Sequence, residues 1–330
     1  MDLLGNLWIG LETALTPINL LYCLVGVFFG TAVGVLPGLG PVATIAMLLP
    51  ITFGLPPESA LIMLAGIYYG AQYGGSTTAI LVNLPGESSS VVTALDGYQM
   101  ARQGKAGRAL ATAAIGSFIA GTIATFVIIF FAPPLASIAL KFGPAEYFSL
   151  MVLGLIASIV LARGSLLHAL AMIVLGLFLG LVGTDITSGS ERYTFDLPKL
   201  ADGIDFVIVA MGIFGIGEIV ANLENESKRE LLAKRVTGLM PTREDWRRII
   251  GPIFRGTVLG SILGILPGGG AMLASFGAYS LEKKVSPNSA EFGKGAIEGV
   301  AAPESANNAG AQTSFIPMLT LGVPSNPVMA

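Results

Sequence analysis

The chain has 330 residues, of which 53% are hydrophobic and only 12% are charged, and its formal net charge at pH 7 is −3. Soluble domains carry about 25% charged residues. A surface this poor in charge could not stay hydrated, whereas a bilayer accepts apolar side chains on every side. With a mean hydropathy of +0.75, the composition excludes a soluble protein and predicts an all-α integral membrane protein. We expect the lipid bilayer to surround it and expect no nucleic acid partner.

The N-terminal part of the chain carries no lysine or arginine before Arg102. Cytoplasmic loops are enriched in these residues, so we expect the N-terminus to lie outside. Because no basic residue precedes the first apolar stretch, we expect no cleavable signal peptide. Prolines interrupt the apolar sequence between Leu36 and Gly97, and the number of crossings there stays open. They are Pro37, Pro41, Pro50, Pro56, Pro57 and Pro85.

Five later runs are apolar and long enough to cross about 30 Å of hydrocarbon, which predicts a multi-span helical bundle. They are Arg108–Phe131, Glu146–Ala162, Leu166–Gly183, Ile204–Leu223 and Ile249–Leu266. The third of these runs contains His168, the only histidine. We expect His168 to pack against neighbouring helices rather than to bind a ligand.

The segments between these runs differ in charge. Gly97–Arg108 and Asn222–Arg248 are rich in arginine and lysine, whereas Asp185–Asp205 carries five acids against Arg192 and Lys199. Crossing the spans in order places both basic segments on one face and the acidic loop on the other. Basic loops mark the cytoplasmic face, so we expect the two basic segments to be cytoplasmic.

The two ends of the chain resemble each other. Gly30–Gly40 reads GTAVGVLPGLG and Gly260–Gly270 reads GSILGILPGGG, an alignment at a constant offset of 230 residues (Gly30 to Gly260). A weaker second similarity relates GGSTTAILVNLPGES at Gly74–Ser88 to TSFIPMLTLGVPSNP at Thr313–Pro327, at a different spacing. These similarities predict two internal repeats, each with Gly/Pro-interrupted, re-entrant helices. We divide the chain into 1–110, the first repeat core; 111–248, intervening spans and a basic cytoplasmic segment; and 249–330, the start of an incomplete second repeat.

Interrupted membrane helices at matching positions of two repeats point to a transporter's binding site. Proline ends a helix and glycine lets the chain turn, which frees N–H groups at one helix start and carbonyl groups at another helix end. Inside a membrane these groups need partners. Helix N-termini suit carboxylates, and free carbonyls suit cations. The alternative is that these helices are only kinked and packed through small residues.

At these motifs the chain resembles the TctA family, the large membrane subunit of tripartite tricarboxylate transporters. The resemblance covers essentially the whole chain and rests on five segments. They are GVLPGLGP at Gly34–Pro41, YYGAQYGGSTTAILVNLPGE at Tyr68–Glu87, VVTALDGYQMARQGKAGRAL at Val91–Leu110, GILPGGGA at Gly264–Ala271 and APESANNAGAQTSFIPMLTLGVPSNPVMA at Ala302–Ala330.

The resemblance implies the large permease subunit of a secondary active carboxylate uptake transporter, driven by an H⁺ or Na⁺ gradient, in the bacterial inner membrane. It implies a small membrane subunit and a periplasmic solute-binding protein as partners, small carboxylates as substrates, and no cofactor. Family members are longer than this chain, so we expect it to be a fragment that lacks a C-terminal part. A channel, or an unrelated carrier with broken helices, stays an alternative. With one histidine, one cysteine and no carboxylate pair in the clear spans, an intramembrane enzyme is not expected.

Polar residues near the interruptions are the candidate site. Glu87 is the cation-coupling candidate, because a carboxylate near membrane depth is a functional candidate by default; its alternative role is a solvated cap. Glu298, Glu304, Asn307 and Asn308 form a second polar cluster, and Asn326 takes the place of Glu87 when the two proline turns are aligned. The expected substrate-binding residues are Gly38, Gly40, Ser76, Thr77, Thr78, Asn83, Gly86, Gly268, Gly269, Gly270, Asn307, Asn308, Thr313, Ser314, Ser325 and Asn326. For the hydroxyl residues, the alternative is a bond back to their own helix.

Overall fold

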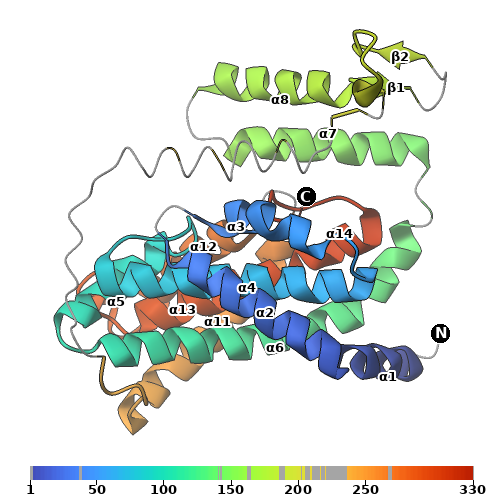
Figure 1. The fold of residues 1–330 in the computed structure, drawn as a ribbon. Coiled ribbons are helices and arrows are strands. Elements are labelled where there is room, and N and C mark those ends of the chain that lie inside the picture. Colours follow the sequence, from blue (N-terminus) through green and yellow to red (C-terminus); the bar gives the residue numbers. More distant parts are fainter. Residues whose placement is uncertain are drawn as a thin grey trace.

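The computed structural model is almost entirely helical (Figure 1). The described residues are 3–36, 39–139, 141, 143–161, 165–185, 190–201, 203–204, 209, 216, 220, 236–266 and 270–329. Strand occurs among them only as one antiparallel pair of two-residue strands, β1 (Gly183–Thr184) and β2 (Glu191–Arg192). An all-α membrane protein was therefore the right fold class.

Six helices form the N-terminal half. They are α1 (Leu3–Ala14), α2 (Pro17–Gly34), α3 (Pro41–Leu48, followed by a 3₁₀ turn at Leu49–Thr52), α4 (Pro57–Val82), α5 (Val91–Arg102) and α6 (Ala106–Ala139). Proline is well suited to the first helical position, where its missing N–H would have no partner. Pro17, Pro41 and Pro57 each open a helix in this way. The prolines that obscured the number of crossings are largely helix starts.

Two further helices, α7 (Pro144–Leu161) and α8 (Leu166–Gly180), lie apart from the main bundle in Figure 1. The prediction that His168 packs between helices was wrong. Its ring is exposed in the first turn of α8, and Nδ1 lies 2.5 Å from the Oγ of Ser165, the N-cap residue. A 3₁₀ turn follows at Pro198–Leu200. The predicted span Ile204–Leu223 lies almost wholly outside the described residues.

The C-terminal half contains α11 (Arg243–Ile265), α12 (Gly270–Val285), a 3₁₀ turn at Ser289–Glu291, α13 (Glu298–Thr313) and α14 (Phe315–Leu321). A capping box starts α11, because the Thr242 side chain accepts a hydrogen bond from the Asp245 backbone and Asp245 bonds back to Thr242. Asp245 also pairs with Arg108 at the start of α6, with 2.8 Å from Nε to Oδ2. The described parts of the two basic segments therefore meet at one end of the bundle.

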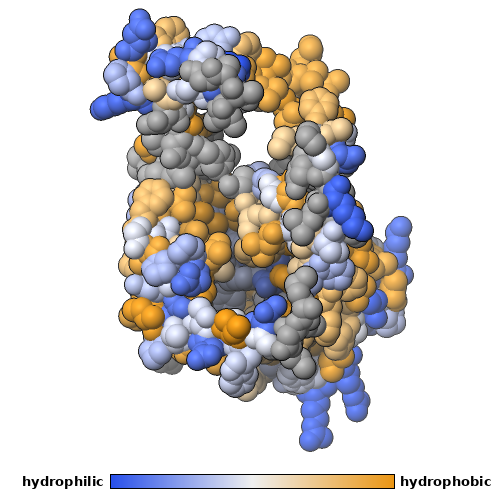
Figure 2. Space-filling model, turned by 90° about the vertical axis from the view of Figure 1, so that its right-hand side faces the viewer, coloured by the Kyte–Doolittle hydropathy of each residue, from blue (hydrophilic) through white to orange (hydrophobic). Residues whose placement is uncertain are grey.

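Among the described residues, three helices are long and apolar enough to cross a membrane: Pro17–Gly34, Ala106–Ser137 and Arg243–Ile265. The second and third contain most of the predicted spans Arg108–Phe131 and Ile249–Leu266. Large hydrophobic side chains are exposed along α6, including Phe118 at 75% exposure. Broad hydrophobic areas are also visible on the surface in Figure 2. Such a surface suits lipid rather than water.

Helices α2 and α4 touch through glycine. An added Cβ at Gly26, Gly30 or Gly34 would lie 2.3–2.4 Å from a carbonyl oxygen of α4, at Met63, Ile67 and Ala71 respectively. No side chain fits at such a distance. Small residues let membrane helices approach closely, and here the two backbones are in direct contact.

The same arrangement joins α11 to α13. An added Cβ at Gly256, Gly260 or Gly264 would lie 2.3–2.4 Å from the carbonyl oxygens of Ala302, Ala306 and Gly310 respectively. These glycines follow Gly26, Gly30 and Gly34 by 230 residues, and their contacts on α13 follow those on α4 by 239 residues (Met63 to Ala302). We call the two sets the glycine contacts of the α2/α4 pair and of the α11/α13 pair.

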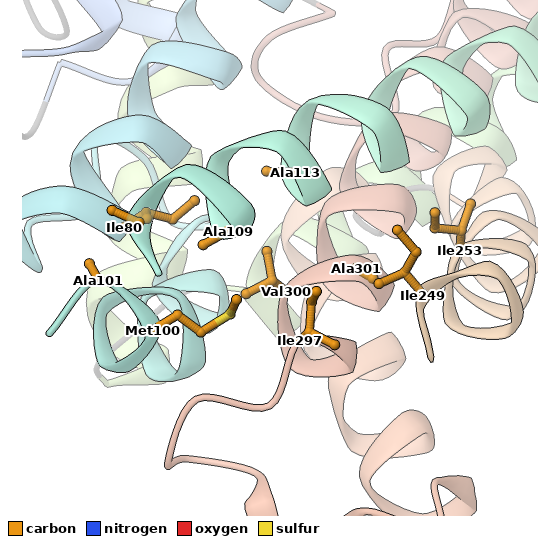
Figure 3. Packing of buried hydrophobic residues seen from close by; sticks show 11 residues of the cluster. Ile80, Met100, Ala101, Ala109, Ala113, Ile249, Ile253, Ile297, Val300 and Ala301 are labelled. Atoms are coloured by element: carbon orange, nitrogen blue, oxygen red, sulfur yellow. The ribbon is translucent and has the colours of Figure 1, made fainter. Parts of the chain in front are cut away.

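Helix α13 runs through the centre of the bundle, and nearly every residue of it is buried. It packs against α5, α6, α11 and α12. The main apolar core lies around its N-terminal half and consists mainly of alanine and isoleucine (Figure 3). Its labelled members are Ile80, Met100, Ala101, Ala109, Ala113, Ile249, Ile253, Ile297, Val300 and Ala301. Any polar group on the buried faces of α13 must therefore find its partners on neighbouring helices or in the backbone of α13 itself.

Candidate functional site

The first interruption lies between the end of α2 at Gly34 and the start of α3 at Pro41. The loop after α4 returns to it. An added Cβ on Gly40, the N-cap of α3, would lie 3.5 Å from the Glu87 Cβ and 3.6 Å from the Gly86 carbonyl oxygen. Gly86 also donates its N–H to the Gly75 carbonyl at 3.4 Å. Glu87 is therefore held beside the N-terminus of α3.

The second interruption lies between the end of α11 at Ile265 and the start of α12 at Gly270. Here the loop after α14 returns in the same manner. An added Cβ on Gly270 would lie 3.2 Å from the Asn326 Nδ2 atom. That nitrogen also donates to Ser314 Oγ at 3.2 Å, and Ser325 Oγ donates to the Ser314 carbonyl at 3.4 Å. Asn326 is therefore held beside the N-terminus of α12.

The two loops correspond in detail. Asn83 ends α4 in the left-handed conformation with a φ of 57°, and Gly322, 239 residues later, ends α14 with a φ of 67°. Glu87 and Asn326 stand at the same offset, beside Gly40 and Gly270, which are 230 residues apart. The residues of the interruptions themselves, Pro37, Gly38, Pro267, Gly268 and Gly269, lie outside the described residues. The predicted site residues Gly38, Gly268 and Gly269 are among them.

The Glu87 carboxylate faces serines of its own loop. Ser89 Oγ donates to Oε1 at 2.5 Å, and Ser90 Oγ donates to the Glu87 carbonyl at 2.9 Å. The Ser89 carbonyl in turn accepts a hydrogen bond from Ser275 Oγ of α12 at 2.7 Å. The loop after α4 is thereby tied to α12, the helix that follows the second interruption. Glu87 also interacts electrostatically with Glu304, so the two carboxylates lie in one region.

Glu304 of α13 has an exposed fraction of only 2%. Ser76 Oγ of α4 lies 2.9 Å and 3.0 Å from its two carboxylate oxygens. Thr93 of α5 donates a second hydroxyl hydrogen bond to Oε1. Of the two groups of polar residues predicted from the sequence, Ser76 of the first bonds to Glu304 of the second, and the charge of Glu304 acts on Glu87.

Two buried amides, on α4 and α13, carry polar atoms that have no partner in good hydrogen-bond geometry within the described part of the chain. They are both polar atoms of Gln72 and Nδ2 of Asn307, three residues after Glu304. The Asn307 amide lies beside the Glu304 carboxylate, and its Oδ1 accepts a hydrogen bond of 2.6 Å from Asn308 Nδ2. Gln72 stands four residues before Ser76, and residues at this spacing share one face of a helix. Buried polar groups are nearly always paired with protein or ordered water.

The other buried carboxylates of the bundle have strong partners. Arginine pairs with Asp245, Glu282 and Glu298. Asp96 of α5 accepts three backbone N–H bonds at 2.8 Å, from Gly293, Gly295 and Ala296, and one from the Tyr279 hydroxyl at 2.9 Å. These contacts serve as structural ties between elements. Glu304 differs, because its side-chain partners among the described residues are neutral hydroxyls and an amide.

Several predicted site residues are instead bonded to their own helix. Thr77 Oγ1 donates to the Tyr73 carbonyl at 2.9 Å, Thr78 Oγ1 to the Gly75 carbonyl at 3.0 Å, and Thr313 Oγ1 to the Ala309 carbonyl at 3.0 Å. For these threonines the alternative role stated from the sequence is the one observed. Ser314 also bonds back, to the Gly310 carbonyl at 2.7 Å, but reaches Gly264 of α11 at 3.1 Å as well.

Asn308 links Asn307 to α6, because its Nδ2 donates to Asn307 Oδ1 at 2.6 Å. Its Nδ2 also donates to Ser117 Oγ of α6 at 2.7 Å, and it lines a pocket of about 460 Å³ between α2, α4, α6 and α13. Gln312 and Tyr69 also line this pocket, and the Tyr69 hydroxyl has no hydrogen-bond partner among the residues described. The pocket is lined mainly by apolar surface with some neutral hydroxyls and amides, and neither Glu87 nor Glu304 lines it.

Sequence reasoning missed Thr93 and Gln72 as site residues. Gln72 carried a signal, because it precedes Ser76 by one helical turn within the motif Tyr68–Glu87. Thr93 carried none, since its role depends on the packing of α5 against α13. Glu304 was noticed in a polar cluster but was not assigned the cation role that the prediction gave to Glu87.

Comparison with known proteins gives matches over nearly the whole chain. The profile of the family described as "Tripartite tricarboxylate transporter TctA family" matches residues 20–330. An uncharacterised 52.8 kDa protein of Agrobacterium vitis, from the "TAR-I ttuC' 3'region", is 67% identical over 330 residues. These residues are 100% of this chain and 66% of that relative, so the chain spans less than two thirds of its length.

A second Agrobacterium vitis protein, uncharacterised and from the "TAR-II ttuC' 3'region", is 75% identical over 71 residues. The match covers 22% of this chain and 29% of that relative. No solved structure matches the fold.

Proposed function

Because the chain belongs to the tripartite tricarboxylate transporter TctA family, we propose that it forms the large, multi-pass permease subunit of a bacterial inner-membrane uptake system for small carboxylates. The family is one of transporters, not of enzymes. In this proposal a periplasmic solute-binding protein delivers the carboxylate, a small membrane subunit completes the transporter, and an Na⁺ or H⁺ gradient drives uptake.

The observation that carries the proposal is the matched pair of contacts Gly40–Glu87 and Gly270–Asn326. Each contact stands at the N-terminus of a helix that follows an interruption. The first N–H groups of a helix lack intrahelical partners and favour negative charge. A carboxylate solute fits beside Asn326, whose amide can donate a hydrogen bond. Beside Glu87 it meets like charge unless a cation neutralises that side chain first.

This difference between the two sites gives a physical reason for coupling. A cation near Glu87 removes the repulsion that a carboxylate solute would meet there, so the binding of cation and solute would be cooperative. The size of such coupling is commonly about 1–3 kcal/mol. The two helix starts would then have different roles. The one beside Glu87 would respond to the cation, and the one beside Asn326 would bind the solute.

We also propose that the two halves are internal repeats with re-entrant helices. The glycine contacts of the α2/α4 and α11/α13 pairs, at matching offsets, support this, as does the left-handed end of both α4 and α14. The division into 1–110, 111–248 and 249–330 remains part of the proposal. Its first boundary falls inside α6, which begins at Ala106.

The proposal is tested by uptake into proteoliposomes that contain the full-length permease and the small subunit, with the binding protein added outside. Labelled citrate, followed by smaller dicarboxylates, is offered under an inward Na⁺ gradient, an inward H⁺ gradient, or neither. We expect saturable accumulation above the outside concentration under one of the gradients. Equilibration without accumulation would favour a channel, and no uptake of any carboxylate would contradict the proposed substrate class.

A further inference from the structure

We propose that Glu304 is the binding site of the coupling cation, with the Ser76 and Thr93 hydroxyls as its neutral ligands. This inference rests on the proposed function, because a coupling cation presupposes gradient-driven transport. It assigns the principal cation site to a residue of α13 at the centre of the bundle, and it leaves Glu87 as a neighbouring carboxylate.

The charge balance around Glu304 is the first argument. An ionised carboxylate in an apolar interior is strongly unfavourable unless a positive charge or several hydrogen bonds compensate it. Asp245, Glu282 and Glu298 each have an arginine for this purpose. In the part of the chain that the structure describes, no lysine, arginine or histidine pairs with Glu304. A bound proton or metal cation supplies the missing positive charge.

The surrounding oxygen atoms are the second argument. Ser76 and Thr93 hold the carboxylate from two different helices, and each hydroxyl oxygen keeps lone pairs that can face a cation. The unpaired Gln72 Oε1 lies on the Ser76 side of α4. Asn307 offers the carboxylate its amide N–H groups, because its Oδ1 accepts a hydrogen bond from Asn308 Nδ2. Carboxylate, hydroxyl and amide oxygens are the ligands that hard cations prefer. The unpaired Gln72 amide indicates that the region holds a further polar partner.

The ionisable groups on the surrounding elements have partners of their own, and Glu87 is the one on which the charge of Glu304 acts. Arg255 of α11 and Glu282 of α12 bind each other. From α13 itself, Glu298 is bound by Arg248 at 2.8 Å. From α5, Asp96 is bound by three backbone N–H groups and Tyr279. From α6, Arg108 is bound by Asp245. Glu87, from the loop after α4, interacts electrostatically with Glu304. A cation at Glu304 therefore also lowers the repulsion between these two carboxylates.

The position of Glu304 suits coupling between the two halves. Its own helix belongs to the α11/α13 pair, whereas Ser76 and Thr93 belong to α4 and α5 of the first half. Binding or loss of a cation changes the strength of the contact that joins the halves. The site thereby links cation occupancy to the relative arrangement of the two interruptions.

The test measures cation binding directly, without a solute. The full-length permease with its small subunit is placed in nanodiscs, and the Tm is followed in NaCl against choline chloride and from pH 5.5 to 8.5. We expect the wild type to be stabilised by Na⁺ if the cation is sodium, or by acid alone if it is a proton. In Glu304→Gln, which mimics the neutral state, we expect that response to be lost.

Weaker variants cover the case in which Glu304→Gln does not fold. If the cation is sodium, Ser76→Ala and Thr93→Val should each raise the half-saturating Na⁺ concentration about tenfold, the usual effect of losing one hydrogen bond. If it is a proton, the half-saturating H⁺ concentration should change by the same factor. Ser305→Ala is the matched control, because its buried hydroxyl bonds only to the Ala301 carbonyl of its own helix at 2.8 Å. This control should respond to the cation as the wild type does.

The inference is overturned if the wild type responds to neither cation, or if Ser76→Ala and Thr93→Val respond like Ser305→Ala. Failure of the proposed function looks different. In that case the wild type would bind the cation in nanodiscs, yet proteoliposomes would accumulate no carboxylate under any gradient.

Discussion

Ser76 donates a hydrogen bond of 2.9 Å to the carboxylate of Glu304, although the two residues are 228 positions apart in the chain. This contact joins α4 of the first half to α13 of the second at a buried position. It lies in the same region as Glu87, whose loop is tied to α12 through Ser89 and Ser275. Glu87 of the first half and Glu304 of the second half therefore lie in one region of the bundle.

The first prediction concerns Glu87. In Glu87→Gln the carboxylate that would repel an anionic solute at the N-terminus of α3 is gone. We expect the KM for the carboxylate to depend less on the driving cation, with the remaining uptake weakly coupled. Uptake rates measured across a range of Na⁺ concentrations and pH values would show this. Unchanged cation-coupled uptake would remove Glu87 from the mechanism.

The second prediction concerns Asn326. Asn326→Asp places a negative charge where a carboxylate solute is proposed to bind. Asn326→Ala removes the amide without adding charge, and with it the hydrogen bonds to Ser314 Oγ and from the Val328 and Met329 N–H groups. We expect the KM to rise about tenfold for the alanine variant, the usual effect of one lost hydrogen bond, and more for the aspartate variant. Initial rates over a range of citrate concentrations give the KM. Equal effects of the two variants would argue against an anion at this position.

The third prediction concerns the glycine contacts. A Cβ at Gly30 or Gly260 would lie 2.3 Å from the carbonyl oxygen of Ile67 or Ala306. Gly30→Ala and Gly260→Ala should each push a helix pair apart, at a cost of about 1–3 kcal/mol or more. Thermal unfolding of purified protein would measure the loss. Gly121→Ala on α6 is the control, because no atom lies within 4 Å of its added Cβ, and this variant should be as stable as the wild type.

The fourth prediction separates a structural carboxylate from a functional one. Asp96→Ala leaves the backbone N–H groups of Gly293, Gly295 and Ala296 without their acceptor, and the buried Ala296 N–H alone costs about 1–3 kcal/mol. Tyr279→Phe removes only one donor and should be much milder. We expect Asp96→Ala to reduce the yield of folded protein, and any protein that folds should keep the cation dependence of the wild type. A changed Na⁺ or pH midpoint would show that Asp96 belongs to the transport site.

Much of the local structure followed from the sequence. The apolar runs predicted α6 and α11, because each is bounded by arginine and is long enough to cross hydrocarbon. The alignment of the two proline turns made Asn326 the sequence equivalent of Glu87. In the structure each of the two residues lies beside the N-terminus of a helix. Periodic apolar character and a repeated motif are properties of contiguous residues, so one sequence reveals them.

The tertiary contacts of the site did not follow. Nothing near Ser76 indicates that it bonds to Glu304 while Thr77 and Thr78 bond to their own helix, because the difference depends on which face of α4 meets α13. Thr93 reaches the same carboxylate across 211 positions of the chain. His168 was misplaced for a related reason, since α8 has no neighbour on its His168 side in the described residues and the ring bonds to Ser165 instead.

The backbone contacts within the α2/α4 and α11/α13 pairs restrict how the protein can move. Helices whose main chains touch cannot slide without a clash, so each pair should behave as a rigid body. The moving joints would then lie where side chains rather than main chains meet, as at Ser117 and Asn308. Spin-label distances within a pair should stay constant through the transport cycle, and distances between α6 and α13 should change; the opposite pattern would place the hinge inside the pairs.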